Sequence, residues 1–149
     1  QYLVDLTRFY DSGYKRGFAD ATDTTPRKGH FFIDVSGWGL GRGVLEVFVG
    51  ADFKLVLKNL NLMGITETED VTRNVAGLFY YHEGHTLIWI REYQRTPYHV
   101  SVIVHEVTHA VIYYLRRNGR DYTDFGELTS SFVDNLVCSV LTNLEGSNE

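Results

Sequence analysis

The sequence predicts an α+β fold in which a small, mostly antiparallel sheet packs on two long helices. The chain has 149 residues, 44% of them hydrophobic, which is enough for one domain with a core of its own. Short apolar or alternating segments bounded by turn residues are typical of strands, and they occur at residues 31–35, 44–49, 76–81 and 86–91. Apolar residues at helical spacing dominate residues 97–144. Neither a repeat nor a linker divides the chain, so we expect residues 1–149 to form a single domain.

Composition excludes several classes of partner. The net charge is −5 and no run of Lys or Arg forms a basic patch, so we expect no nucleic acid or membrane partner. One cysteine, Cys138, cannot form an internal disulfide, and it favours a reducing compartment. No apolar run reaches transmembrane length and no signal peptide is recognisable. We therefore expect a cytoplasmic protein, with a processed or secreted form left open because the chain begins at Gln1.

The N-terminal third gives the weakest pattern, and residues 1–29 remain poorly defined. Residues 1–18 are rich in aromatics and fit either a helix or an extended segment, whereas residues 19–29 predict a loop. Strands are expected at residues 31–35 and 44–49, joined by a turn rich in glycine. These glycines are not a dinucleotide-binding fingerprint, because a strand follows them where that motif needs a helix.

The middle of the chain predicts one helix and one hairpin. Phe53 to Leu60 has helical spacing, with Asp52 at its start and Gly64 as its stop, and an acidic surface loop follows. Two strands, 76–81 and 86–91, are joined by a turn at Glu83-Gly84. The histidines on either side of that turn resemble a metal motif that is one residue short. We interpret them as a solvent-exposed hairpin tip.

Two helices are predicted in the last third. Thr96 is a good N-cap and Pro97 a good first residue for a helix that runs to Arg117 and stops at Asn118-Gly119. A second helix begins at about Phe125. Its apolar stripe is formed by Leu128, Phe132, Leu136, Val140 and Leu144.

The first of these helices carries an H-E-x-x-H motif, His105-Glu106-Val107-Thr108-His109. His105 and His109 lie one turn apart on one face, so both imidazoles can bind one metal ion, and Glu106 lies beside them where it can act on a water. The flanking residues 101–104 and 110–114 contain no charge, proline or glycine, as expected for a buried helix. Two core histidines bonded to the backbone or to tyrosine hydroxyls are the weaker interpretation.

A catalytic zinc ion needs a third protein ligand. The best candidate is Glu127, which lies 18 residues beyond His109 (127 − 109), near the start of a second helix that would fold back on the first. An alternative is that Glu127 forms a capping box with Asp124. The other candidate ligands are Asp121, Asp124 and Asp134.

These segments resemble a known family. Residues 102–111 fit the extended zincin helix pattern, and Gly126-Glu127-Leu128-Thr129-Ser130-Ser131 resembles the Asn-Glu-x-x-Ser-Asp of thermolysin-like gluzincins. The chain is similar to a small gluzincin of the compact kind that phages and other microbes encode. It departs from the pattern at two positions, where Gly126 replaces the family's Asn and Ser131 replaces its Asp. In the family that Asp orients a zinc-bound histidine, and here Asp134 or Ser131 itself would take this role. Ile112 and Leu115 exclude a metzincin, and residues 119–122 match an aspzincin less well.

The resemblance implies a zincin-like fold and a zinc-dependent endopeptidase that acts on a protein or peptide substrate. Zinc would be held by His105, His109 and Glu127, with Glu106 as general base. The resemblance implies a tyrosine or histidine as oxyanion donor, which the sequence does not identify, and Tyr113 and Tyr122 are the candidates. Residues 86–91 would be the sheet edge that pairs with substrate. The alternative is a catalytically silent zincin-like domain whose metal site serves stability or partner binding.

Overall fold

The computed structural model describes residues 25–38, 43–66, 75–119 and 127–146. Its elements follow one another in the order β1 (Gly29–Asp34), a 3-10 turn η2 (Ser36–Trp38), β2 (Val44–Val49), α2 (Phe53–Leu62), β3 (Gly77–His82), β4 (His85–Ile90), α4 (Pro97–Arg117) and α5 (Glu127–Gly146). Among the described residues the fold is therefore α+β, as predicted. The segments predicted at residues 1–24, 67–74 and 120–126 lie outside the described residues.

The four described strands form one mixed, open sheet in the order β1-β2-β4-β3. β1 pairs antiparallel with β2 and β3 pairs antiparallel with β4, whereas β2 and β4 are parallel. The chain passes from β2 to β4 through α2 and the outer strand β3, so the parallel pair is joined by a long connection, as parallel strands require. Two of the three pairings are antiparallel, in agreement with the prediction.

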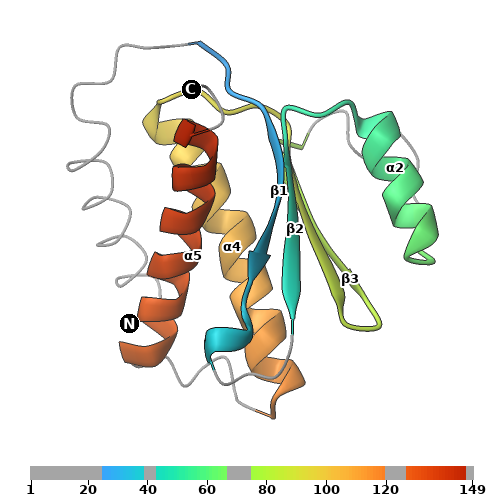
Figure 1. Ribbon diagram of the computed structural model, residues 1–149, viewed down its shortest axis with the longest axis vertical. Coiled ribbons are helices and arrows are strands. Elements are labelled where there is room, and N and C mark those ends of the chain that lie inside the picture. The colour runs from blue at the N-terminus through green and yellow to red at the C-terminus, as the bar shows by residue number, and fades with distance from the viewer. Residues whose placement is uncertain (1–24, 39–42, 67–74, 120–126, 147–149) are drawn as a thin grey trace.

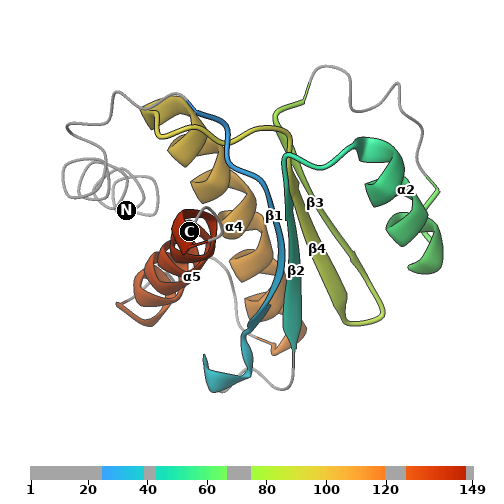
Figure 2. The ribbon, with the colours of Figure 1, turned by 45° about the horizontal axis from the view of Figure 1, so that its top comes forward.

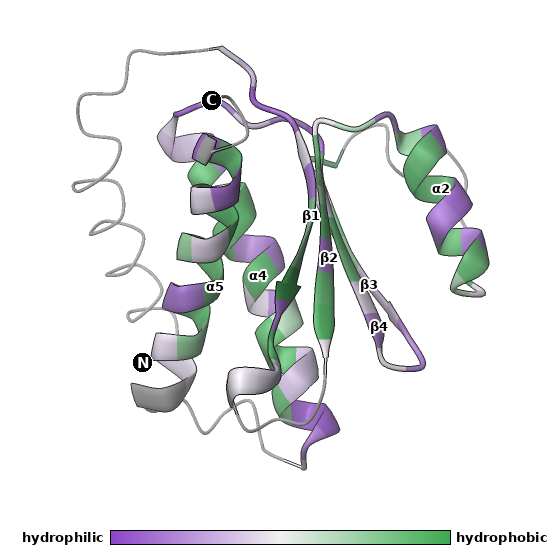
Figure 3. Ribbon diagram, in the orientation of Figure 1, coloured by the Kyte–Doolittle hydropathy of each residue, from purple (hydrophilic) through white to green (hydrophobic). Residues whose placement is uncertain are grey.

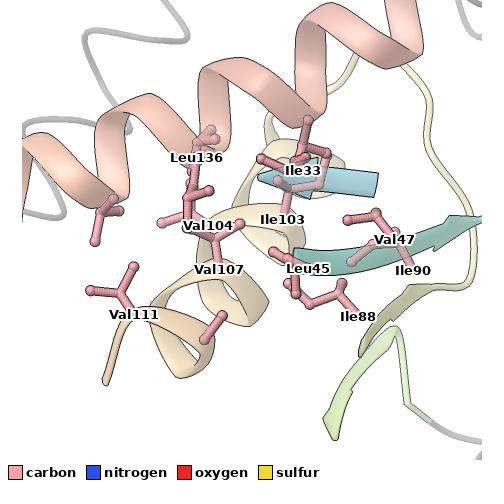
Figure 4. Close-up of a cluster of buried hydrophobic side chains, with 14 of the residues drawn as sticks. Ile33, Leu45, Val47, Ile88, Ile90, Ile103, Val104, Val107, Val111 and Leu136 are labelled. Carbon is pink, nitrogen blue, oxygen red and sulfur yellow. The ribbon is translucent and has the colours of Figure 1, made fainter. Parts of the chain in front are cut away.

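Helices cover both faces of the sheet (Figures 1 and 2). α4 and α5 lie on one face, where alternate residues of the central strands, such as Leu45, Val47 and Ile88, join the larger hydrophobic cluster drawn in Figure 4. The intervening residues, including Phe48 and Trp89, point to the other face and pack with α2. Figure 3 shows that the hydrophobic residues of the helices lie on the faces that are turned toward the sheet. Strands buried on both faces need nearly continuous apolar sequence, which β2 and β4 have.

The predicted edge strand is wrong. β4, which covers most of residues 86–91, lies inside the sheet between β2 and β3, and β3 is the edge. All residues of β4 after His85 are buried, because both layers of helices cover this strand. β3 ends instead in exposed Tyr81 and His82, as suits a strand with one side open. Both strands of the hairpin have strand-like sequence, and hydropathy alone does not say which one pairs with β2.

α4 begins and ends where its sequence predicted. The Thr96 side chain accepts a hydrogen bond from the backbone N–H of His99, and Pro97 occupies the first turn. The helix ends after Arg117, and Gly119 then takes a positive φ of 74°. The cap predicted for α2 is also present, since Asp52 accepts a hydrogen bond from the N–H of Lys54.

α5 returns antiparallel to α4 and packs on it and on β1 (Figure 1). Its predicted stripe is buried at Phe132, Leu136, Val140 and Leu144. The ring of Phe132 stacks on that of Tyr114 in α4, with centroids 6.0 Å apart. Among the described residues, no helix is both long and apolar enough to cross a membrane.

Candidate metal centre and adjoining groove

His105 and His109 come together on the exposed face of α4. Their Nε2 atoms are 3.2 Å apart, and the two rings are inclined by 80°. Two nitrogens bonded to one tetrahedral zinc ion at about 2.0–2.1 Å are about 3.3 Å from each other. The pair therefore already has the separation that a shared metal ion requires, and the predicted juxtaposition of the two histidines is present.

The charge state of His109 also suits a metal. Burial lowers the pKa of His109, and the neighbouring His105 lowers it further. The imidazole of His109 therefore favours its neutral form, which has a free lone pair. Metal ligation requires that form, because protons compete with a cation for the same nitrogen.

Glu106, the next residue of α4 after His105, is directed toward Gly77 of β3 and is only 6% exposed. Burial raises the pKa of its carboxyl to about 7. A buried carboxyl with a pKa near neutrality can both accept and return a proton at physiological pH.

Gly77 of the edge strand makes room for this carboxylate. A Cβ placed on Gly77 would lie 3.0 Å from Cγ of Glu106 and 3.1 Å from the backbone oxygen of Trp89. The glycine thus allows close approach of β3 to α4, and any side chain there would meet both the catalytic candidate and a rigid backbone. The sequence analysis missed this residue, although a glycine inside a strand often marks such an approach.

The third ligand is not settled by the described side chains. Among them, no group of three His, Cys, Asp or Glu residues can hold a metal ion, so Asp134 does not join His105 and His109. Glu127 is the first residue of α5. Five residues later in the same helix, Phe132 stacks on Tyr114, a residue of α4 that follows His109. The described part of Glu127 is its backbone, and Asp121, Tyr122 and Asp124 lie outside the described residues. Glu127 therefore stays a prediction as the third ligand.

A groove of about 420 Å³ extends from His109 between β3 and the last two turns of α4. It is lined by Phe79, Tyr81, His109, Ile112, Tyr113, Arg116 and Arg117. Tyr113 stacks on Tyr81, with ring centroids 4.3 Å apart. Tyr113 thus lines the same groove as His109, and its role as oxyanion donor stays a prediction.

The other histidine motif belongs to a different surface. His85 lies at the hairpin turn, half-exposed, with its Nε2 3.1 Å from Oε1 of the buried Glu46. The second oxygen of Glu46 is 2.7 Å from Nε2 of His30. His85 therefore bonds to a buried carboxylate on the α2 side of the sheet, and it is more than the solvated tip expected from sequence.

Taken together, the paired histidines can bind a transition metal, and the buried carboxylate that follows His105 in α4 can exchange a proton. A groove beside the edge strand β3 leads to His109. Comparison of the chain with protein-family models, with curated proteins and with solved structures found no match.

Proposed function

We propose that this protein is a zinc-dependent endopeptidase of the gluzincin type. The observation that carries the proposal is the exposed His105–His109 pair, with Nε2 atoms 3.2 Å apart, beside the buried carboxylate of Glu106. Structural zinc sites are closed by four protein ligands, whereas catalytic sites leave one position open. Both histidines are exposed, which favours an open site and hence catalysis over a purely structural role.

Zinc would be held by His105, His109 and Glu127. When bound, zinc would acidify a water molecule and polarise the substrate carbonyl. Glu106 would accept the proton of that water as it attacks the peptide carbonyl, and it would then donate the proton to the leaving amine. Tyr113 and Tyr122 are the candidates to donate a hydrogen bond to the oxyanion.

Strand β3 supports a peptide substrate rather than a small molecule. Residues of β3 and β4 pair in a fixed register from Ala76 and Arg91, where the N–H of Arg91 donates to the oxygen of Ala76, to His82 and His85 at the turn. In an antiparallel ladder every second residue of a strand bonds to its partner, and the residues between them turn their backbone groups to the opposite side. The N–H and C=O groups of Gly77, Phe79 and Tyr81 are therefore directed away from β4. Among the described strands, none pairs with this outer side. An extended peptide can add there as a further strand, beginning at the residue that touches Glu106.

Glu106→Gln tests the proposal directly. The amide keeps the shape of the side chain but cannot accept a proton, so this variant should bind zinc and lose nearly all cleavage of a peptide library. His105→Ala should lose both zinc and cleavage. If the wild-type protein holds zinc tightly yet cuts no peptide from about pH 5 to 9, the alternative of a catalytically silent metal-binding domain takes precedence.

A further inference from the structure

We propose that the groove beside His109 is a subsite for an aromatic side chain of the substrate, on the N-terminal side of the cleaved bond. This inference rests on the proposed peptidase function, and it adds a substrate class that the zinc ligands and Glu106 do not determine. Its basis is a cluster of three aromatic rings, Phe79, Tyr81 and Tyr113, which line the groove.

Each of the three rings lies next to the other two. The centroid of Tyr113 in α4 is 6.0 Å from that of Phe79 and 4.3 Å from that of Tyr81, and the two β3 rings are 6.0 Å apart. Aromatic rings at about these separations attract one another beyond the burial of their area. The cluster therefore joins β3 to α4 and gives the groove an aromatic wall that is already formed before a ligand enters.

The wall has room for another ring. Tyr81 is 59% exposed, although its ring stacks on that of Tyr113 with an inclination of only 17°. Ile112 adds an aliphatic side chain to the same wall. The groove volume of about 420 Å³ lies in the range of about 300–1,000 Å³ that is typical of small-ligand sites. An aromatic side chain in the groove would remove its own surface and that of Tyr81 from water together.

The aromatic wall lies to one side of the proposed catalytic groups. A Cβ on Gly77 would lie 3.0 Å from Cγ of Glu106, so the start of β3 lies against the proposed general base. Phe79 and Tyr81 follow two and four residues later, which is about 7 and 13 Å along a strand. Tyr113 follows Glu106 by seven residues (113 − 106), which is about 10 Å along a helix. Both elements therefore lead away from Glu106 in the same direction and meet at the rings.

The outer backbone of β3 sets the orientation of the peptide. Antiparallel pairing is the more stable arrangement of two strands. A peptide antiparallel to β3 runs from the Tyr81 end toward Gly77, so the residues over Phe79 and Tyr81 precede the bond that lies at Glu106. Side chains alternate between the two faces of a sheet, and those that share the face of Phe79 and Tyr81 enter the groove. The subsite thus receives a side chain roughly two to four residues before the cleaved bond.

A peptide-library digest, read by mass spectrometry, gives the cleaved sequences and the preferred residue at each position. Quenched fluorescent peptides of one such sequence then carry Phe, Leu or Ala at the position that shows the preference. We expect kcat/KM of the wild-type protein to be at least about tenfold higher for the Phe peptide than for the Ala peptide. Leu should be intermediate, about threefold below Phe, because it lacks the attraction between rings. The Phe-to-Ala ratio should persist at about 1 M salt, where charge interactions are screened beyond about 3 Å.

The chain offers a matched control for the tyrosine. Tyr81→Ala should bring the Phe-to-Ala ratio close to one, whereas Tyr81→Phe should preserve it because the ring remains. Tyr98→Ala removes an equally exposed tyrosine (62%) from the first turn of α4, at the opposite end from the groove, and should leave the ratio unchanged. Thermal unfolding of each variant separates loss of fold from loss of selectivity.

The outcomes distinguish this proposal from the peptidase proposal. Four results overturn the subsite and leave the peptidase intact: equal cleavage of the three peptides, an aromatic preference only after the cleaved bond, a preference that Tyr81→Ala retains, or one that is lost at high salt. If nothing is cleaved, the anisotropy of labelled alanine peptides that contain a single Phe or a single Ser decides. Binding of the Phe peptide alone, abolished by Tyr81→Ala, supports the subsite and refutes the peptidase. Absence of both cleavage and binding refutes the subsite as well.

Discussion

Gly77 of the edge strand lies so close to Glu106 of the motif helix that a side chain at position 77 would collide with the carboxylate. An added Cβ would lie 3.0 Å from Cγ and 3.2 Å from Oε2 of Glu106, and 3.1 Å from the backbone oxygen of Trp89. The backbone of β4 cannot yield, so the carboxylate would have to move. This close approach joins the proposed general base to the strand that is proposed to bind substrate.

Gly77→Ala should therefore impair the chemical step without removing the metal. A displacement of the general base by a few tenths of an ångström should lower kcat by roughly ten- to a hundredfold while zinc content stays near one per chain. Gly37→Ala is the control, because a Cβ there meets nothing within 4 Å. Steady-state kinetics and metal analysis of both variants check this expectation. Wild-type kcat in Gly77→Ala would show that the contact is irrelevant to catalysis.

The elements that the sequence predicted well are those with strong local signals. Thr96 and Pro97 mark the start of α4, and the stripe from Phe132 to Leu144 marks the buried face of α5. The H-E-x-x-H spacing likewise predicted that His105 and His109 share one face, because helical geometry is local.

Features that depend on pairing between distant segments were missed. The sequence does not say that β4 rather than β3 pairs with β2, so the edge strand was assigned to the wrong half of the hairpin. The contact of Gly77 with Glu106 and the groove that ends at Arg116 and Arg117 follow from that same pairing.

Zinc content should distinguish the third ligand. Glu127→Ala should lower the zinc affinity by at least tenfold, because His105 and His109 alone leave the ion with too few protein ligands. Asp134→Ala should keep zinc, since Asp134 does not join the histidines in the described part of the chain. Metal analysis after dialysis against a weak chelator measures both. Loss of zinc in Asp134→Ala with retention in Glu127→Ala would reverse the assignment.

The metal-free protein should be stabilised by Glu106→Gln at neutral pH. Folding raises the pKa of Glu106 from an ordinary 4.5 to about 7, so the folded state holds a proton that the unfolded chain has already lost. The contribution of the protonated Glu106 carboxyl to the free energy of unfolding is complete below about pH 4.5 and is lost as the pH rises through 7. Above that range Glu106→Gln should be the more stable by roughly 1–3 kcal/mol, and near pH 4.5 the two proteins should be equal. Urea denaturation in the presence of a chelator measures the difference, and a gap independent of pH would contradict it.

High pH should destabilise the fold in part through Tyr114. This side chain is 2% exposed in the core between α4 and the sheet, and its hydroxyl bonds to that of Thr86, which itself donates to the carbonyl of Val44. Burial raises the pKa of Tyr114 to about 12, against 10 in the unfolded chain. The contribution of the neutral hydroxyl is present below pH 10 and is lost as the pH rises toward 12.

Tyr114→Phe should therefore have two opposite effects. At neutral pH it removes one buried hydrogen bond and should cost about 1 kcal/mol. Between about pH 10 and 12 the ionisation of Tyr114 favours unfolding of the wild type, and Tyr114→Phe lacks this group. The free energy of unfolding of the variant should therefore fall less steeply with pH than that of the wild type. Tyr98→Phe, at a 62% exposed position, is the control and should follow the wild-type curve. Denaturation curves at several alkaline pH values, with tyrosinate absorbance recorded in parallel, compare the slopes. Parallel curves for wild type and Tyr114→Phe would show that Tyr114 ionises without unfolding the core.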